Sequence, residues 1–190
     1  MLKLLQKLCD LSGVSGDEDA VREFILSYAR PYIVQSKIDN MGNLYLAKRG
    51  TKRAKRKLML CAHMDEVGMI IKDITDDGML KFGFVGGVDR RVMIGKRVRV
   101  GEKRVPGVIG IKAIHLLSSD EQKSVPKTKD LYIDIGADSR TQAEQYVNRG
   151  DYAVFDSSFH YLGEHAVCAK AIDDRVGCAT LLKLLEKDQP

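Results

Sequence analysis

The N-terminal part of the chain has the apolar periodicity of two amphipathic helices. Leucines recur at helical spacing in Leu2–Leu11, and the pair Ser12–Gly13 marks the end of the first helix. Ser15 and Glu18 have the spacing of a capping box, in which side chains satisfy backbone N–H groups at a helix start. The second helix is predicted to begin there and to end near Pro31, with an apolar face formed by Val21, Phe24, Ile25 and Tyr28.

The hydrophobic pattern then changes to the period of extended chain. Residues Ile33–Asp39 alternate like a strand, a turn is predicted at Asn40–Asn43, and a second strand at Leu44–Ala47. The segment Leu58–Ala62 is apolar at every position, which is typical of a central strand covered on both faces by helices. Buried strands and helices together indicate the α/β class.

From Met69 to about Phe155 short strand patterns recur between glycines, which predicts a small β-barrel or sandwich. One helix is expected in this region, from Ser139 to Asn148, with Ser139 and Gln142 as another capping box. The predicted strands are Met69–Lys72, Met79–Val85, Arg97–Val100, Val108–Ile111 and Leu131–Ile135.

The last part of the chain returns to a buried strand, Ala166–Ala169, and a helix, Val176–Leu185. The simplest organisation is therefore one α/β domain that a β-rich domain interrupts. We place the α/β domain at residues 1–67 and 165–190, and the inserted domain at residues 68–164. Because the resumed part contributes only one strand and one helix, the sheet has fewer strands than an α/β domain normally needs, and the domain looks incomplete.

Charge changes this picture at one place. The formal net charge is +5, but seven basic residues lie between Lys48 and Lys57, and without them the balance is −2. A nucleic-acid contact is one interpretation of this run. No aromatic residue is interleaved for base stacking, and the run lies between two predicted strands. We therefore favour a solvated hairpin loop and expect no nucleic-acid partner.

The rest of the composition predicts a soluble, cytoplasmic protein. Hydrophobic residues make up 44% of the chain and charged residues 30%, which is typical of globular proteins. No apolar run approaches the roughly 20 residues that cross a bilayer, and lysines interrupt the N-terminal leucines, unlike a secretory signal. The four cysteines lack C-x-x-C spacing and three lie in apolar stretches, so we expect buried, reduced thiols.

The first candidate site is His63-Met64-Asp65-Glu66, directly after the predicted strand Leu58–Ala62. In extended chain His63 and Asp65 project from the same face, and functional residues of open α/β sheets gather at the carboxyl ends of strands. A neutral imidazole is a good ligand for zinc or cobalt, and a nearby carboxylate can accept its other ring N–H. A chance grouping of a histidine with two acids is the alternative.

The second candidate site is the acidic pair Asp173-Asp174, between the predicted strand Ala166–Ala169 and the helix Val176–Leu185. Either carboxylate could cap the helix, whose positive N-terminal end favours an acid. A metal is a second reason for adjacent acids, because one carboxylate can bridge two cations about 3.5–4 Å apart. Capping is favoured for the pair alone, and a shared sheet edge with His63 favours the metal.

Two motifs and several glycine-containing segments resemble those of one enzyme family. The first motif is Ala62–Gly68, and the second is Lys170 with Ile172–Arg175. The further similarities are Gly13–Gly16, Gly86–Val88, Gly107–Gly110, Asp134–Ala137 and Gly150–Asp151. Over nearly the whole chain they resemble metallopeptidase family 42, the glutamyl, deblocking and tetrahedral-particle aminopeptidases. The 110 positions from His63 to Asp173 fit this family, whereas related co-catalytic peptidases usually place the second aspartate much sooner.

The resemblance implies a role for each site residue. His63 would ligate one of two divalent metal ions, zinc or cobalt, and Asp173 would bridge both. Asp65 would belong to the catalytic machinery by orienting His63 and tuning its basicity. Family members complete the site with a Glu-Glu pair, a further aspartate and a C-terminal histidine, which have no counterpart here. We therefore expect an N-terminal portion of such an enzyme that is inactive alone.

The resemblance also implies a partial three-layer, zinc-peptidase-like α/β domain with an inserted β-barrel (PDZ-like) dimerisation domain. The expected reaction releases N-terminal residues from peptides, and the expected partners are peptide substrates and further copies of the chain. A non-catalytic paralogue that acts in oligomer assembly is the alternative, and a nucleic-acid binder is a third. A polysaccharide hydrolase finds little support, because it would need a carboxylate pair flanking a sugar site.

Overall fold

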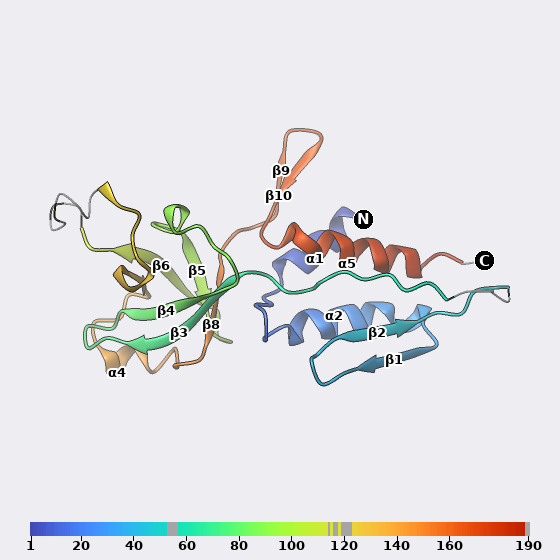
Figure 1. Cartoon of the computed structure of the whole chain (residues 1–190), viewed down its shortest axis with the longest axis horizontal. Helices are drawn as coiled ribbons and strands as arrows, with labels where there is room; N and C mark the ends of the chain where they lie inside the picture. The colour runs from blue at the N-terminus through green and yellow to red at the C-terminus, as the bar shows by residue number, and fades with distance from the viewer. Residues whose placement is uncertain (53–56, 114, 116–117, 119–122, 189–190) are drawn as a thin grey trace. The chain divides into compact units, whose positions relative to one another are not determined.

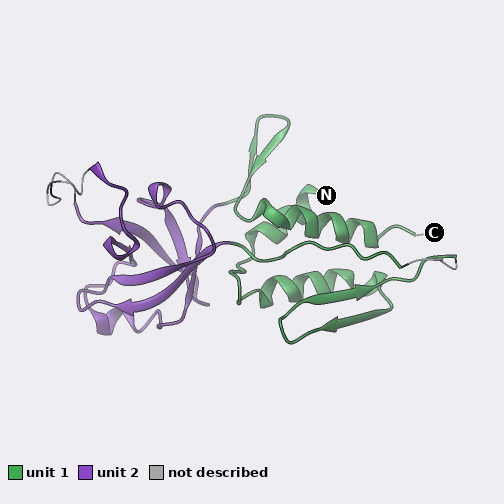
Figure 2. Cartoon of the chain, viewed as in Figure 1, with its two compact units in different colours: residues 1–66, 158–190 green, residues 67–157 purple. Residues whose placement is uncertain are grey.

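The chain forms two compact units, coloured separately in Figure 2. Unit 1 comprises residues 1–66 and 158–190, and unit 2 comprises residues 67–157. The sequence predicts the two domain boundaries directly after residue 67 and directly after residue 164. The computed structural model describes residues 1–52, 57–113, 115, 118 and 123–188.

Helices form the core of unit 1 (Figure 1): α1 (Leu2–Asp10), α2 (Asp19–Ala29) and α5 (Ile172–Leu185). α5 packs against both α1 and α2, and a 3-10 turn, η1 (Arg30–Tyr32), follows α2. The helices predicted from periodicity are thereby confirmed. Their buried hydrophobic residues are Leu4, Leu5, Leu8, Cys9, Val21, Ile25, Ala29, Cys178, Ala179 and Leu182. No helix among the described residues is long and apolar enough to cross a membrane.

The capping box predicted at Ser15 and Glu18 is wrong. α2 begins at Asp19, and no side chain caps its first turn. The Glu18 carboxylate instead accepts a hydrogen bond of 2.7 Å from the backbone N–H of Gly16, and the Ser15 hydroxyl donates to Asp65. A partner 50 positions away thus takes the hydroxyl that the local pattern assigns to the helix.

The strands that the structure describes in unit 1 form two separate antiparallel hairpins. β1 (Gln35–Ile38) pairs with β2 (Leu44–Ala47), which confirms the two predicted strands. β9 (His160–Leu162), which the sequence pattern does not reveal, pairs with β10 (Ala166–Cys168). The prediction of a buried strand at β10 is wrong, because only its central residue is even partly buried.

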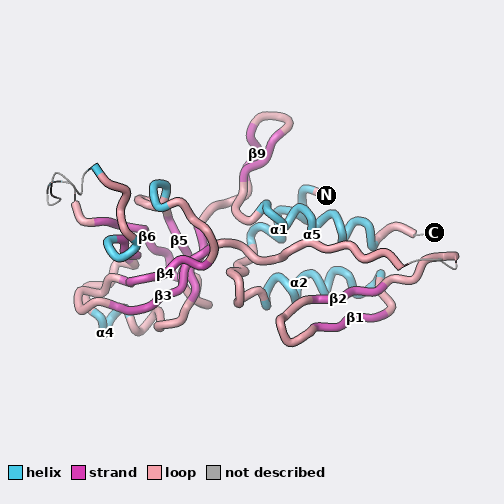
Figure 3. The backbone as a smooth tube through the Cα atoms, viewed as in Figure 1, coloured by secondary structure: helices cyan, strands magenta, loops and turns pink. Residues whose placement is uncertain are grey.

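The predicted central strand Leu58–Ala62 is also wrong. No strand is assigned to it, and Figure 3 shows this segment as loop leading to the first strand of unit 2. Its first three residues are exposed, while Ala62 and Met64 pack on the helical core. A central strand needs hydrogen-bonding neighbours on both edges, and none of the described strands pairs with this segment. The three-layer arrangement therefore stays a prediction.

Unit 2 is a closed barrel with the strand order β3-β4-β7-β6-β5-β8, which confirms the β-rich fold. The strands are β3 (Gly68–Ile74), β4 (Leu80–Val85), β5 (Arg97–Val100), β6 (Val105–Ile111), β7 (Leu131–Asp134) and β8 (Tyr152–Phe155). The sequence pattern misses β8. The 3-10 turns η2 (Arg90–Val92) and η4 (Thr128–Asp130) lie between strands. The helix predicted from Ser139 to Asn148 is shorter in the structure, where α4 spans Arg140–Ala143. Ser139 caps it as predicted, because its side chain accepts a hydrogen bond from the Gln142 N–H.

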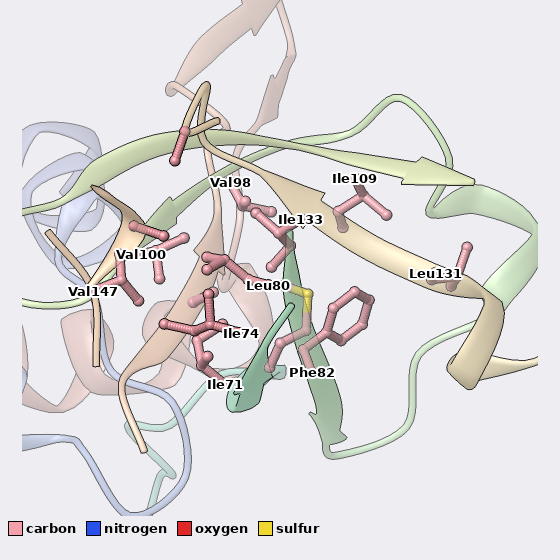
Figure 4. Packing of buried hydrophobic residues seen from close by; sticks show 14 of the residues in the cluster. Ile71, Ile74, Leu80, Phe82, Val98, Val100, Ile109, Leu131, Ile133 and Val147 are labelled. Carbon is pink, nitrogen blue, oxygen red and sulfur yellow. The ribbon is translucent and has the colours of Figure 1, made fainter. Parts of the chain in front are cut away.

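Side chains fill the interior of this barrel (Figure 4). Ile109 on β6 and Ile133 on β7 are cross-strand partners, and both are fully buried. Ile133 is also the partner of Leu80 on β4, which is buried as well. Small barrels normally close on packed side chains of alternate residues. Unit 2 therefore has a hydrophobic core of its own.

The cysteines differ from the prediction of buried thiols. Cys9 and Cys178 are buried, whereas Cys61 and Cys168 are exposed, and all four are free. Burial raises the pKa of the Cys9 thiol, and it raises that of Cys178 to about 11. The thiolate is the reactive form of cysteine. Cys9 and Cys178 are therefore protected from thiol reagents both by their burial and by their raised pKa, which keeps them protonated.

We expect Ellman's reagent to separate these two pairs in the native chain. Cys61 and Cys168 should react rapidly, and Cys9 and Cys178 only after unfolding by guanidinium. The absorbance of the released thionitrobenzoate measures the number of fast thiols. A Cys61→Ser, Cys168→Ser variant that still reacts rapidly would contradict the burial of the other two.

Candidate metal site

Both predicted site segments belong to unit 1, and the second, Asp173-Asp174, lies in the first turn of α5, where both residues have non-helical backbone angles. His63 and Asp65 stand in a loop without regular structure, and a turn at Lys170–Ala171 leads into α5. The structure brings His63, Asp65 and Asp173 together, although His63 and Asp173 are 110 positions apart.

His63 makes a polar contact through each ring nitrogen. Nδ1 lies 2.9 Å from Oδ1 of Asp65, and Nε2 lies 3.1 Å from Oδ1 of Asp173. The His63 side chain is 56% exposed and that of Asp173 is 96% exposed. Both donor groups are therefore open to a ligand from solvent.

Asp65 is held in place by Ser15, a residue that the sequence pattern assigns to another task. The Ser15 hydroxyl donates to Oδ2 of Asp65, while His63 contacts Oδ1. The hydrogen bond from Ser15, reinforced by that from His63, keeps the pKa of Asp65 below its usual value despite partial burial. A charged Asp65 can accept a proton from Nδ1 of His63, and in metal sites such a contact orients the ring with Nε2 towards the metal.

The structure separates the two acids of the pair Asp173-Asp174. The peptide bond between them is cis, and both have non-helical backbone angles. Asp174 accepts a hydrogen bond of 3.0 Å from the backbone N–H of Gly177, which is the contact of an N-cap residue. Asp173 does not cap the helix and faces His63 instead. A capping contact thus accounts for Asp174, while a metal-bridging role for Asp173 stays a prediction.

These residues fit a divalent metal as part of a donor set. Imidazole and carboxylate are ordinary zinc and cobalt ligands. Two donors on one tetrahedral zinc, each at about 2.0–2.1 Å, lie ~3.4 Å apart, near the 3.1 Å between His63 Nε2 and Asp173 Oδ1. In the part of the chain that the structure describes, no group of three or more His, Cys, Asp or Glu side chains could hold a metal. Catalytic zinc usually has three protein ligands.

A buried ionic cluster next to these donors was not predicted from the sequence. Glu66 Oε1 lies 2.6 Å from Nζ of Lys170 and 3.9 Å from Nη2 of Arg175. The side chains of Glu66 and Arg175 are 3% and 0% exposed. Each of these charged residues lies within one of the two motifs, which is the one sequence signal that sets it apart, because Glu66 and Arg175 each follow an aspartate. Such groups are almost never fully buried unless paired.

The pKa of the His63 ring is expected to lie above the usual value for histidine. Burial lowers the pKa of His63, but hydrogen bonds to Asp173 and Asp65 raise it by more, so the net shift is upward. The protonated ring therefore stabilises unit 1 below about pH 6.5, and this contribution is lost as the pH rises through the folded-state pKa. Proton NMR of the metal-free chain should give a midpoint above 6.5, and Asp173→Asn should lower it. A midpoint of 6.5 or below in the unmodified chain would contradict the contact.

The basic run Lys48–Lys57 lies partly outside the described residues, which exclude positions 53–56. At its start, Nζ of Lys48 donates to the backbone carbonyls of Leu185 and Lys187 at 2.6 and 2.7 Å. A cation at the end of α5 is favoured by the negative end of the helix dipole. This lysine thus has a structural partner within unit 1.

Comparison with known proteins extends the similarity of the two motifs to the surrounding chain. The model of the M42 glutamyl aminopeptidase family matches residues 42–189, which include His63, Asp65 and Asp173. The chain belongs to this M42 family. Its curated relatives include a lysyl aminopeptidase and a glutamyl aminopeptidase, and aminopeptidases are hydrolases.

Three M42-like proteins illustrate the similarity. The aminopeptidase of the archaeon Desulfurococcus kamchatkensis is 37% identical with a TM-score of 0.89, over 97% of this chain and 51% of that one. The TET1 peptidase of Pyrococcus horikoshii, which can assemble into a tetrahedron or a large octahedral shell, is 37% identical with a TM-score of 0.86, over 98% and 56%. The lysyl aminopeptidase of Pyrococcus furiosus is 30% identical over 92% of this chain and 51% of its own length. The chain spans about half the length of the curated relatives it matches.

Proposed function

We propose that these 190 residues form the N-terminal part of a dinuclear-metal aminopeptidase. The observation that carries the proposal is the approach of His63 Nε2 to Asp173 Oδ1 at 3.1 Å, with Asp65 on the other ring nitrogen. Membership of the M42 family supports the aminopeptidase reaction. The substrate would be the free N-terminus of a peptide.

The chain's own residues would divide the work at the metals. A pair of divalent ions, zinc or cobalt, would supply Lewis acidity and an acidified water at neutral pH. His63 offers Nε2 as a terminal ligand, and Asp65 holds the proton on Nδ1. Asp173 has two carboxylate oxygens for bridging. Asp174 caps α5 and so keeps the turn that carries Asp173 attached to a rigid helix.

We extend the proposal to the domains. Residues 1–67 and 165–190 would be parts of a three-layer catalytic α/β domain, and residues 68–164 an inserted PDZ-like domain for dimerisation. The closed barrel of unit 2, with its own hydrophobic core, supports an autonomous insert. The tetrahedral and octahedral assemblies of the TET1 relative support a homo-oligomer.

The purified 190-residue chain is expected to have negligible peptidase activity alone. His63 and Asp173 provide two donors, and the described residues hold no larger group, so a dinuclear site would be bound weakly. The rate of aminoacyl-nitroanilide hydrolysis with added zinc or cobalt measures this. Turnover that a chelator abolishes would show that the donor set is complete without further residues.

A chimera tests the aminopeptidase proposal itself. Residues 1–190 would be joined to the part of the Desulfurococcus kamchatkensis aminopeptidase that follows its matched half. We expect chelator-sensitive hydrolysis of aminoacyl-nitroanilides by this chimera. A folded, metal-loaded chimera without turnover would contradict the proposal and favour an assembly role.

A further inference from the structure

The two metal donors do not hold their own loops together. His63 and Asp173 meet in a single contact of 3.1 Å, and both side chains are largely exposed. Contacts between exposed charged groups contribute little to stability, because water and salt screen them. Another interaction must therefore keep the loop at residue 63 beside the turn at residue 173.

The buried carboxylate of Glu66 links these two segments. Glu66 directly follows Asp65, and Lys170 lies in the turn that leads to Asp173. Their side chains are 3% and 7% exposed and form an ion pair of 2.6 Å. Glu66 Oε1 also accepts from the backbone N–H of Gly13 at 3.1 Å, and the Glu66 N–H donates to the Gly13 carbonyl at 2.8 Å. Each end of this link is thus fixed in the interior of unit 1.

Arg175 adds a second cation behind the same carboxylate. It lies two positions after Asp173, is fully buried, and donates from Nη1 to the carbonyl of Leu8 at 2.6 Å. Nε and Nη2 have no hydrogen-bond partner among the described residues. Burial lowers the pKa of Arg175, and the charge of Glu66 opposes this shift. Lys170 and Arg175 therefore share one carboxylate, and the cluster carries an excess positive charge.

A thiol makes one more connection between the segments. The Sγ of Cys178, on the first turns of α5, donates to the backbone carbonyl of His63 at 3.2 Å. This contact restrains the main chain of His63, whereas the ionic cluster restrains the residues on either side of Asp173. Both connections are internal to unit 1, and neither involves the metal donors' own side chains.

We propose that Glu66 is a positioning residue for the metal. Through its ion pair with Lys170 and its contact with Arg175, it sets the separation of His63 and Asp173 before any metal binds. The inference rests on the proposed metal site and adds a cause for its geometry. A preformed pair of ligands binds metal more tightly, because the two segments are already ordered and binding does not have to offset the entropy cost of ordering them.

The test is a zinc titration of the metal-free 190-residue chain, followed through the ring resonances of His63. These resonances are assigned with His63→Ala, so the titration reports on His63 itself, and a Cys61→Ser, Cys168→Ser background removes the two exposed thiols that would compete for zinc. Lys170→Met keeps the aliphatic length and leaves Glu66 balanced by Arg175, so this variant is expected to fold. Glu66→Gln removes the carboxylate and keeps the shape. We expect each variant to weaken zinc binding at His63 by about 10-fold or more.

Glu186→Gln is the matched control. It makes the same substitution on another carboxylate of unit 1, which forms a 2.6 Å ion pair with Lys183. Circular dichroism identifies the temperature range in which each variant is folded, and titrations are compared only there. A substitution that only destabilises the fold would lower the melting temperature, and it would leave the zinc affinity of the folded chain unchanged in this range. We expect the control to bind zinc like the unmodified chain.

The outcomes separate this inference from the proposed function. If His63 of the unmodified chain does not respond to zinc, the metal site and the inference both fail. If it responds and folded Lys170→Met binds zinc equally well, the inference alone is overturned. An unfolded Glu66→Gln leaves the decision to Lys170→Met. A double variant that binds no more weakly than the single ones would show that Glu66 and Lys170 act as one unit.

Discussion

Glu66→Ala is expected to lower the free energy of unfolding of unit 1 by about 3–5 kcal/mol, the usual cost of removing one partner from a buried ion pair. The variant removes the carboxylate that lies 2.6 Å from the ammonium of Lys170 and 3.9 Å from the guanidinium of Arg175. It also leaves the backbone N–H of Gly13 without the acceptor at 3.1 Å. Urea titration measures the loss, and hydrogen exchange of peptides from α1 and α5 assigns it to unit 1.

The barrel of unit 2 provides the internal reference for this experiment. Its core does not include Glu66, so exchange in β3 to β8 should stay unchanged. The control Glu186→Gln should leave exchange in α1 nearly unchanged as well, because its ion pair is partly exposed. A loss well below 1 kcal/mol for Glu66→Ala would mean that water or rearranged side chains compensate the two cations.

His63→Ala is expected to abolish metal-dependent aminopeptidase activity in the chimera. It removes one of two donors from the described part of the site, and alanine offers no substitute ligand. Asp65→Asn should have a smaller effect, a loss of about 10–100-fold, because the residue acts on the metal only through the orientation of His63. The values of kcat and KM at saturating zinc, with metal content measured for each variant, test this order.

A variant of Ser15 extends the comparison to the residue that holds Asp65. Ser15→Ala removes the hydroxyl that donates to Asp65 and should reduce activity less than Asp65→Asn. Equal losses for His63→Ala and Asp65→Asn would contradict an orienting role. They would place Asp65 among the metal ligands instead.

Local patterns predicted the local parts of the fold and of the site. The periodicity of Leu2–Leu11 predicted α1, and alternation with glycine predicted most strands of the barrel. The contact between His63 and Asp65 follows from their two-residue spacing. These features depend on neighbours in the chain, which the sequence displays directly.

Patterns failed where partners come from far along the chain. Leu58–Ala62 has the composition of a central strand, but a strand forms only where other strands pair with it. Ser15 has the position of a helix cap, yet its hydroxyl bonds to Asp65. In both cases a non-local contact, or its absence, outweighs a correct local preference.

The sequence by itself determined which groups are available for chemistry: an imidazole, an acidic pair and the family motifs that contain them. Only the tertiary structure decided which partner each side chain contacts. It turned Asp173 towards His63, used Asp174 as the cap of α5, and buried Glu66 between Lys170 and Arg175. The reason is physical. Burial and charge pairing depend on distances between residues over 100 positions apart, and periodicity carries no information about such distances.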